Sequence, residues 1–537
     1  MIKVPEISLP VREGEDNLLH AAAKKIGVAP SDIRSMRLLR RSVDARHRND
    51  IRYTYTLLLD LGEREASFLK RNRSPKITEY FEEQYEIPRI KPHGARPVVI
   101  GFGPGGIFAA LLLAQAGLCP IVFERGGAIE ERSAAVRAFH SGGRFSASSN
   151  IQFGEGGAGT FSDGKLNTGV NDPRIRRVFE EFVEAGAPGE ILYDAKPHIG
   201  TDLLPGIVKR LREKIITLGG EVCFDTKLCG LTVENGVLTQ IEIMKKDGVR
   251  ETVPVSEMIL AIGHSARDTF SVLHKAGIAM DQKSFSVGAR IEHPQELIDR
   301  GRYGDASLHK LIGAADYRLS EHLPNGRGVY TFCMCPGGEV VCASSEENGI
   351  VTNGMSEYAR ARENANAALL VGVGPGDFGS DHPLAGVEFQ RKIEMAAFEL
   401  SGSYLAPAQR VEDFLKKKAS AAFSSVRPSY LPGVIPSSLD RILPEYVADS
   451  MRQGILRMDR KLPGFAFPDA VLTGPETRSS SPVRILRGEN LESVSARGLY
   501  PCAEGAGYAG GITSAAMDGL KVAEAVIRRF DVPCQMG

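Results

Sequence analysis

Residues 97–106 read Pro97-Val-Val-Ile-Gly101-Phe-Gly103-Pro-Gly105-Gly106, an apolar stretch that runs into a glycine-rich turn. Its apolar start predicts a buried strand, and the Ala/Leu-rich residues 105–116 predict a helix directly after it. Gly101 makes the tight turn, Gly103 lets the backbone approach a pyrophosphate, and Gly106 lets the helix pack closely on the strand. Glu124 ends the next predicted strand, where a carboxylate accepts hydrogen bonds from ribose hydroxyls. This order predicts a doubly wound α/β domain of the Rossmann type that binds a dinucleotide.

The C-terminal stretch 498–512 distinguishes FAD from NAD. It predicts a strand, an acidic residue, glycines and a helix, and it resembles the second FAD signature of the glutathione-reductase-like superfamily. The resemblance implies that Glu504, which stands where Asp is more usual, binds the ribityl or pyrophosphate region. It also implies that the helix N-terminus faces the pyrimidine oxygen of the flavin. The strand 258–263 resembles a third motif of the superfamily, so FAD is the expected cofactor. The residues that carry the second signature are Glu504, Gly505, Gly510, Gly511 and Ile512.

Two further stretches narrow the resemblance. Together with 504–512, residues 153–166 and 476–484 are similar to bacterial FAD-dependent proteins of the NAD(FAD)-utilising dehydrogenase family, which also carry an N-terminal appendage. The resemblance spans essentially the whole chain. It implies an FAD-dependent oxidoreductase that transfers a hydride or electron pair to or from a small-molecule substrate, whose identity stays open.

Residues 374–379, Gly-Pro-Gly-Asp-Phe-Gly, have the spacing of a second nucleotide-binding turn. The residues that follow, 380–384, cannot start the required helix cleanly, and no strand with a charged end comes about 20 residues later. We therefore expect a strand that ends in a Gly/Pro turn and no NAD(P) domain. NAD(P)H is then expected only as a diffusible reductant.

The sequence pattern divides the chain into four segments. Residues 1–90 show a β-α-β-β order that resembles a small ferredoxin-like α/β domain. Residues 97–280 and 481–537 are expected to form the two segments of the FAD-binding domain, because each carries part of its signature. Residues 281–480 lack a βαβ rhythm, and we expect an inserted mixed α+β substrate domain there.

The glycine-rich loop 142–169 is expected to wrap the flavin, because glycines let backbone amides approach a cofactor closely. Lys165 in this loop would place a positive charge near the ring and favour its anionic reduced form; a solvated loop lysine is the alternative. His140 resembles the histidine that bonds flavin covalently in some fumarate-reductase-like enzymes. The loop beyond it does not match, so we expect FAD to be held non-covalently. The remaining expected FAD contacts are Arg125, Gly154, Gly156, Gly157, Leu228 and Gly263.

Arg478 is the expected substrate anchor. A planar guanidinium beside three hydroxyls suits a carboxylate or phosphate poised over the flavin ring. The alternative is a polar loop, and Arg290 is a second candidate for binding an anion. We expect Arg478 and Lys165 to take part in catalysis. The three hydroxyls belong to Ser479, Ser480 and Ser481.

The cysteine pattern favours neither a redox dithiol nor a metal site. The chain has eight cysteines and no Cys-x-x-Cys motif, and no His/Cys cluster has metal-ligand spacing. Cys333 and Cys335 are expected to be two buried thiols in a strand. A strained disulfide or a shared metal is the alternative, since β geometry places both thiols on one side.

The charge balance argues against nucleic acid or an anionic membrane as partner, because Lys plus Arg and Asp plus Glu both number 66. The stretch 32–48 holds six arginines and two aspartates; a solvated strand face is favoured over an RNA or protein-partner surface. The N-terminus lacks the pattern of a secretory signal and the apolar stretch 107–118 is too short to span a bilayer, so a cytoplasmic protein is expected.

Two alternatives to an oxidoreductase stay open. The first is a redox-sensing flavoprotein that docks a partner protein at the arginine-rich N-terminal module. The second is an oxygen-activating flavin monooxygenase. Reduction by NAD(P)H followed by exposure to oxygen separates the three.

Overall fold

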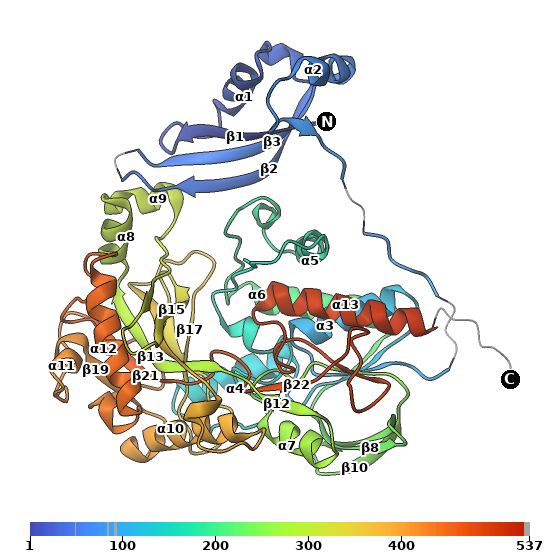
Figure 1. The fold of residues 1–537 in the computed structure, drawn as a ribbon, viewed down its shortest axis with the longest axis vertical. Helices are drawn as coiled ribbons and strands as arrows, with labels where there is room; N and C mark the ends of the chain where they lie inside the picture. Colours follow the sequence, from blue (N-terminus) through green and yellow to red (C-terminus); the bar gives the residue numbers. More distant parts are fainter. Residues whose placement is uncertain (49, 83–84, 91–93, 531–537) are drawn as a thin grey trace.

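The computed structural model describes residues 1–537 except 49, 83–84, 91–93 and 531–537. A small N-terminal module comes first, drawn in blue in Figure 1. Its four strands form an antiparallel sheet in the order β2-β3-β1-β4, which is also the strand order of the ferredoxin-like split βαβ fold. Its elements are β1 (Ile2–Pro10), α1 (Leu18–Ile26), β2 (Ser35–Asp44), β3 (Arg52–Asp60), α2 (Glu65–Arg71) and β4 (Thr78–Glu79).

This module packs against the rest of the chain. Val11 and Ile51 belong to the same buried apolar cluster as the large central sheet. Arg41 forms an ion pair with Asp194 at 2.8 Å, and its backbone N–H donates to Tyr193. The arginine-rich strand is therefore partly engaged by the core, where the sequence indicated a solvated face.

The nucleotide-binding part is built on a five-stranded parallel sheet in the order β23-β11-β5-β6-β7. The C-terminal strand β23 pairs with β11, so residues far apart in sequence share one sheet. Helix α13 lies along α3 on one face of it (Figure 1). The elements are β5 (Val98–Ile100), α3 (Pro104–Gln115), β6 (Ile121–Phe123), α6 (Leu204–Thr217), β7 (Glu221–Cys223), β11 (Met258–Leu260), β23 (Leu499–Pro501) and α13 (Ile512–Phe530).

Glycines set the spacing between α13, α3 and the sheet. A Cβ on Gly519 would lie 2.2 Å from the carbonyl oxygen of Gly105, and one on Gly106 would lie 1.9 Å from that of Gly101. The other face of the sheet carries an antiparallel meander and one helix, which bury Leu228 and Phe270 against it. These elements are β8 (Thr226–Glu234), β9 (Val237–Lys245), β10 (Arg250–Pro254) and α7 (Arg267–Lys275).

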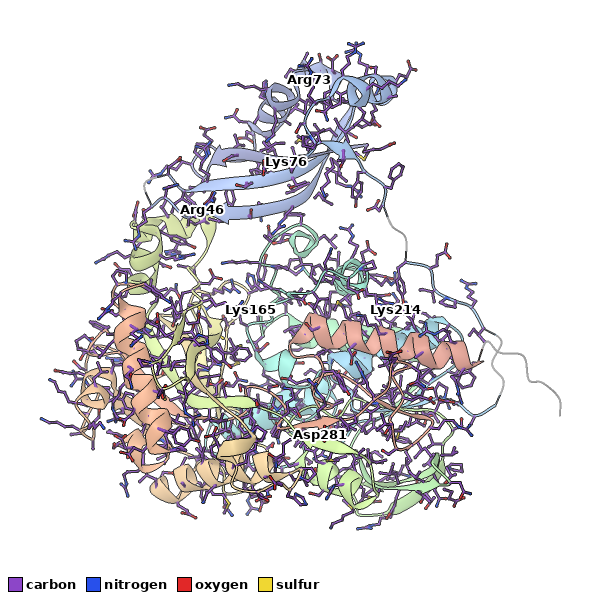
Figure 2. All side chains as sticks on the ribbon, viewed as in Figure 1. Arg46, Arg73, Lys76, Lys165, Lys214 and Asp281 are labelled. Carbon is purple, nitrogen blue, oxygen red and sulfur yellow. The ribbon has the colours of Figure 1, made fainter. Side chains whose placement is uncertain are left out.

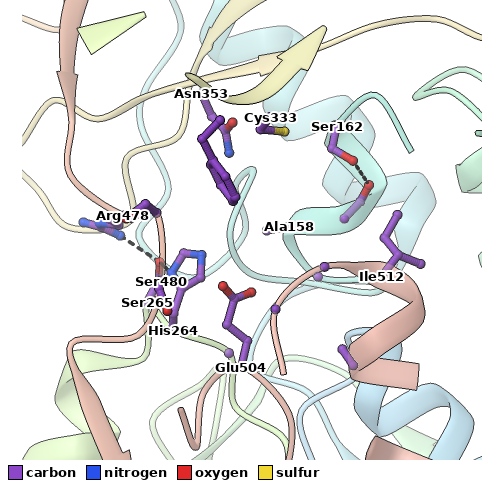
Figure 3. A pocket seen from close by; sticks show the side chains of 18 of the residues that line it. Ala158, Ser162, His264, Ser265, Cys333, Asn353, Arg478, Ser480, Glu504 and Ile512 are labelled. Atoms are coloured by element: carbon purple, nitrogen blue, oxygen red, sulfur yellow. Dashed lines mark hydrogen bonds between the residues drawn. The ribbon is translucent and has the colours of Figure 1, made fainter. Parts of the chain in front are cut away.

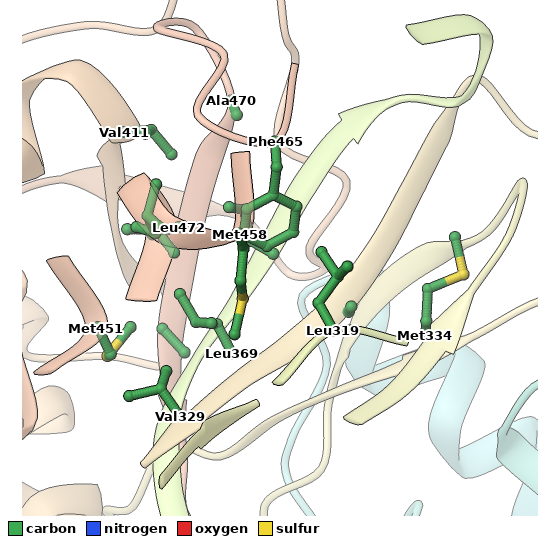
Figure 4. Close-up of a cluster of buried hydrophobic side chains, with 14 of the residues drawn as sticks. Leu319, Val329, Met334, Leu369, Val411, Met451, Met458, Phe465, Ala470 and Leu472 are labelled. Carbon is green, nitrogen blue, oxygen red and sulfur yellow. The ribbon is translucent and has the colours of Figure 1, made fainter. Parts of the chain in front are cut away.

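A seven-stranded sheet, β14-β15-β18-β13-β21-β19-β20, forms the second large part. Its buried face packs on α12, with Leu369, Met458 and Phe465 among the core side chains (Figure 4). The short pair β12–β22 lies at the junction of the two parts. The bounds are β12 (Met280–Gln282), β13 (Phe285–Pro294), α8 (Gln295–Tyr303), α9 (His309–Ile312), β14 (Ser320–His322), β15 (Gly328–Cys335), β16 (Glu339–Cys342), β17 (Thr352–Met355), β18 (Asn364–Val373), α10 (Ala385–Ser401), β19 (Ala406–Arg410), α11 (Val411–Leu415), β20 (Val434–Pro436), α12 (Glu445–Asp459), β21 (Val471–Glu476) and β22 (Val483–Ile485).

The second glycine turn is no nucleotide site. Strand β18 pairs antiparallel with β13 and β15, and residues Pro375–Asp377 after it form a short 3₁₀ turn. The next α-helix, α10, begins only at Ala385. A Rossmann turn needs a parallel strand that leads directly into a helix, so the prediction of a Gly/Pro turn is confirmed.

Candidate flavin site

One large cavity, about 1440 Å³ in volume, lies between the parallel sheet and the seven-stranded sheet. Pockets for drug-sized ligands hold roughly 300–1,000 Å³, so this cavity has room for a dinucleotide and a second molecule. The N-terminal ends of α3 and α13 both open into it, at Gly103–Gly105 and at Gly510–Ile512. Figure 3 shows side chains from both parts of the protein on its walls.

The glycine turn of residues 101–106 has the shape that a pyrophosphate needs. Gly101 has φ +95°, and a Cβ there would lie 2.4 Å from the carbonyl oxygen of Ala261. Gly103 lines the cavity, and only the Cα of Gly157 lies within 4 Å of where its Cβ would be. A helix N-terminus that presents free amides and positive dipole charge at such a turn is an anion site. These residues fit FAD.

Glu124 lines the cavity but does not stand free. Its Oε2 accepts a hydrogen bond from the amide of Phe102 at 2.8 Å. Its Oε1 accepts from the amides of Gly126 at 2.9 Å and Gly154 at 3.0 Å. A carboxylate has about four lone-pair sites. Glu124 therefore organises the turn and the glycine loop, with capacity for one further bond to a ribose hydroxyl.

Arg132 shapes the glycine loop, and the sequence patterns did not single it out. This residue of α4 (Ile129–His140) is fully buried, and its guanidinium donates to backbone carbonyls instead of a carboxylate. Burial lowers the pKa of Arg132 to about 10. A Cβ on Gly154, which has φ +110°, would lie 2.5 Å from the Cδ of Arg132. The guanidinium of Arg132 donates to five backbone carbonyls, those of Asn150, Ile151, Gly154, Glu155 and Gly157.

Most of the expected FAD contacts line the same cavity. Gly106, Gly156 and Gly505 are not among its lining residues; a Cβ on Gly505 would lie 2.6 Å from the backbone nitrogen of Gly263, so Gly505 serves close packing. Arg125 is held by an ion pair with Asp268 at 2.8 Å. The expected contacts that do line the cavity include Gly101, Gly103, Gly105, Glu124, Arg125, Gly154, Gly157, Lys165, Leu228, Gly263, Glu504, Gly510, Gly511 and Ile512.

Glu504 points into the cavity near the N-terminus of α13 (Figure 3). Burial raises the pKa of Glu504 to about 7, against the opposing effect of the nearby Lys283. Its carboxyl group therefore changes protonation near neutral pH and is able to donate or accept a hydrogen bond there.

Lys165 is not a solvated loop lysine. Its side chain is half-buried on the cavity wall, close to strand β15 of the seven-stranded sheet (Figure 2). Its ammonium forms an ion pair with Asp163 at 2.8 Å and donates to the carbonyl of Met334. Although burial opposes it, the Asp163 carboxylate raises the pKa of Lys165. The lysine thus stays charged on the cavity wall.

Arg478 is placed differently from the expected substrate anchor. It lies on the cavity wall, but its Nε and Nη2 donate to Glu394 on α10 at 3.1 and 2.8 Å. Its Nη1 donates to Ser265 at 3.0 Å and also to Ser345. All three nitrogens of the guanidinium are satisfied inside the protein, so the fork is not presented to a ligand.

The neighbouring serines do not form the expected cradle. Ser479 donates to the carbonyl of Ser286, Ser480 accepts from Lys283, and Ser481 donates to the carbonyl of Val483. All three hydroxyls have hydrogen-bond partners inside the protein, which the short-range pattern of Arg followed by three Ser does not reveal.

Arg290 is also internal. It is fully buried on β13 and pairs with Glu476 at 2.6 Å. Its other donors reach the carbonyl of Cys333 and the side chains of Asn353 and Asn366. The expectation of an anion-binding arginine is therefore corrected to a buried structural ion pair.

His264 is a cavity residue that the sequence analysis missed. It follows Gly263 directly, and its ring lies on the wall beside Ser480 and Glu504 (Figure 3). Burial lowers the pKa of His264 to about 3, and the cations Arg478 and Arg267 act in the same direction. A neutral imidazole therefore faces the cavity.

His140 lies away from the cavity. It contributes to a separate small pocket beside Phe139 and Phe145, and burial lowers its pKa. Among the described residues no group of three or more His, Cys, Asp or Glu is arranged to hold a metal ion. Over the same residues, no helix combines the length and apolar character needed to cross a bilayer.

Two family models match parts of this chain, and a protein of known sequence matches nearly all of it. Residues 284–479 match the family model of the FAD-dependent protein, C-terminal domain-like, and residues 1–60 match a domain of unknown function, DUF8436. An uncharacterized protein of Clostridium beijerinckii is 48% identical over 540 residues, which covers 99% of both chains.

Solved flavoproteins are far more distant. A flavoprotein/dehydrogenase from Cytophaga hutchinsonii is 12% identical, with a TM-score of 0.35, over 81% of this chain and 79% of its own. The FAD complex of glycerol-3-phosphate dehydrogenase from Bacillus halodurans is 10% identical, with a TM-score of 0.34, over 83% and 66%. TM-scores of this size do not establish a relationship. The match to the Clostridium protein covers nearly both whole chains, so the chain belongs to that protein's family, with FAD as its cofactor.

Proposed function

We propose that the protein is an oxidoreductase that holds FAD non-covalently and exchanges a hydride or electron pair with a small-molecule substrate. One observation carries the proposal: a single cavity runs from the glycine turn at α3 to the N-terminus of α13 and on to the wall formed by β15. This arrangement provides for a dinucleotide along the parallel sheet and leaves space for a second molecule beside it.

The residues that would hold FAD divide by their chemistry. The amides of the glycine turn and the N-terminus of α3 would bind the pyrophosphate, and Glu124 a ribose hydroxyl. Glu504 would contact the ribityl chain, and the N-terminus of α13 would stabilise negative charge on the ring. When bound, FAD supplies the hydride chemistry.

The chain's own groups would then set charge and protons around the reacting atoms. Lys165 keeps a fixed positive charge on the cavity wall through its pair with Asp163. Glu504, whose pKa is raised to about 7, is able to exchange a proton at neutral pH. His264 is neutral and accepts or donates a hydrogen bond without adding charge. The buried arginines do not compete for the substrate, because carboxylates already occupy them.

NAD(P)H is a candidate reductant that would enter the cavity by diffusion, since the turn at residues 374–379 follows an antiparallel strand and forms a short 3₁₀ turn instead of leading directly into an α-helix. Anaerobic stopped-flow mixing of the purified holoprotein with NADH and NADPH tests the proposal. Rapid loss of the oxidised flavin absorbance by either supports an oxidoreductase. A C4a-adduct absorbance on subsequent exposure to oxygen would assign a monooxygenase instead, and inertness to both would favour a redox sensor.

A further inference from the structure

Two cysteines end strand β15 on the wall of the flavin cavity. Cys333 is half-buried and lines the cavity, where Figure 3 shows it across from Glu504. Among the described cysteines it alone does so. Cys335, two residues on, is buried directly behind it.

The backbone bends between the two cysteines. The pairing of β15 with β18 shifts register between Phe332 and Cys335, and Cys333 adopts φ +42°, a region that residues other than glycine rarely occupy. The bend turns the Cys335 side chain back, so that its Sγ lies 3.3 Å from the carbonyl oxygen of Cys333. Strained conformations of this kind persist where the surroundings enforce them, and they cluster at functional sites.

Two cations contact the tripeptide in this conformation. Arg290 donates to the carbonyl of Cys333 at 2.8 Å, and its Nη1 lies 3.9 Å from the Sγ of Cys335. Lys165 donates to the carbonyl of Met334, the residue between the two cysteines. The arginine comes from β13 and the lysine from the glycine loop, so both parts of the protein converge on this tripeptide.

The two thiols have pKa values that are shifted in opposite directions. The hydrogen bond from Cys335 holds the pKa of Cys333 well below the usual range of a thiol, and Arg290 and Lys165 act in the same direction despite burial. The same interaction and burial raise the pKa of Cys335. Thiolate character is therefore favoured on Cys333, the sulfur that lines the cavity, and disfavoured on Cys335. Thiolate character and access are what make a cysteine reactive.

We propose that Cys333 and Cys335 form a redox pair that exchanges electrons with the bound flavin as a reversible disulfide. Oxidation of the pair forms one sulfur–sulfur bond and releases two electrons and two protons, which balance the reduction of FAD to FADH2. The reverse step breaks that bond and returns the same equivalents to the thiols. This inference rests on the proposed function, because it requires a redox-active flavin in the same cavity.

An anaerobic reductive titration of the oxidised holoprotein with dithionite tests the pair. The wild type is expected to take up four electrons per FAD, two for the flavin and two for the disulfide. Cys333→Ser and Cys335→Ser are each expected to take up two. The control Cys229→Ser, a half-buried strand cysteine that does not line the cavity, is expected to take up four. Uptake of two electrons by the fully FAD-loaded wild type would overturn the proposal.

Thiol counting by mass needs neither flavin turnover nor a variant. Alkylation after denaturation is expected to label six of the eight cysteines in the oxidised protein and all eight after reduction, with Cys333 and Cys335 as the difference. If the flavin fails to reduce but this difference is present, the proposed function fails while the disulfide stands. Eight labelled cysteines in the oxidised protein would refute the disulfide itself.

Lys165 is a positioning residue that acts on the thiol of Cys333, and the pH dependence of alkylation measures its effect on that thiol. Lys165→Gln is expected to shift the pH midpoint for labelling of Cys333 by iodoacetamide upward by about one unit or more, because a nearby cation that stabilises the thiolate is lost. Lys214→Gln, at the α6 lysine labelled in Figure 2, is the matched control and is expected to leave the midpoint unchanged. An unchanged midpoint in Lys165→Gln would contradict the role of this cation.

Discussion

Arg478 and Glu394 form a buried ion pair, with Nη2 of the arginine 2.8 Å from Oε2 of the carboxylate. Arg267 shares the same carboxylate at 2.7 Å, and Thr477 donates to it as well. Although burial opposes it, the two arginines hold the pKa of Glu394 below its usual range. The pair connects the segment after β21 to α10, and it gives the guanidinium of Arg478 a partner inside the protein.

Loss of this pair is expected to destabilise the fold. Arg478→Ala leaves Glu394 with one of its two cations, and breaking a buried ion pair costs about 3–5 kcal/mol. A large fall in the melting temperature measured by calorimetry is the expected result. Arg300→Ala removes an exposed i,i+4 pair with Glu296, worth about 0–1 kcal/mol, and serves as control. Equal melting temperatures in both variants would show that Arg478 is free to bind a ligand.

The glycine turn is expected to be intolerant of side chains. Gly106→Val places a Cβ where it would meet the carbonyl oxygen of Gly101 at 1.9 Å, so the helix cannot keep its position and FAD occupancy should be lost. Gly376→Ala, in the second glycine turn, meets no atom within 4 Å and should keep full occupancy. The ratio of flavin to protein absorbance measures both. Stoichiometric FAD in Gly106→Val would place the cofactor elsewhere.

Glu124→Ala is expected to weaken FAD binding by more than one lost contact. The carboxylate accepts hydrogen bonds from three buried amides, and each donor left unsatisfied costs about 1–3 kcal/mol. The glycine turn and loop should loosen together, and the FAD dissociation constant from equilibrium dialysis should rise at least tenfold. Wild-type affinity in Glu124→Ala would mean that the carboxylate does not organise the site.

Glu504 gives the protein a defined pH dependence. Its pKa is raised from 4.5 to about 7 in the folded state, so the folded protein binds the extra proton, and the stability that this contributes is lost as the pH rises from about 5 through 7. Glu504→Gln removes the penalty and should raise the melting temperature relative to wild type at pH 8 more than at pH 5. Glu489→Gln, at an exposed site, is the control. A pH-independent difference for Glu504→Gln would show that this carboxyl does not titrate in that window.

The N-terminal boundary matters for stability. The module's sheet ends at β4, but Tyr85 donates to Glu524 on α13 at 2.6 Å and Ile90 packs on the nucleotide-binding core. Removal of residues 1–79 should therefore leave a flavin-loaded protein. Removal of residues 1–90 should give a protein with a lower melting temperature than removal of 1–79, because the contacts of Tyr85 and Ile90 are lost as well. Identical melting curves for the two truncations would show that residues 80–90 contribute nothing.

The parts of the site that could be predicted from the sequence are those that depend on residues close together in the chain. Gly101, Gly103 and Gly106 have conformational and packing requirements that depend on a strand and a helix next to them in the chain, so their roles could be assigned before the structure. The acidic strand end and the C-terminal glycines followed from the same logic. Their convergence on one sheet required only the pairing of β23 with β11.

The remainder depends on contacts between distant residues. Arg478 pairs with Glu394 on α10, and Arg132 donates to five carbonyls of a loop. Neither contact produces a periodic pattern in the sequence. Cys333 lines the cavity while Cys335 is buried because β15 shifts register between Phe332 and Cys335, whereas regular β geometry would place both thiols on one side. Charged residues were predicted as ligands because their internal partners could not be seen.

Acid precipitation of the purified protein, followed by analysis of the supernatant, tests whether the protein binds FAD without a covalent bond. We expect the yellow colour to leave the protein and the supernatant to contain FAD at about one equivalent per chain, since the proposed site would hold the dinucleotide by hydrogen bonds and packing alone. A colourless protein that takes up no added FAD, or a flavin that stays attached to the precipitated chain, would contradict it.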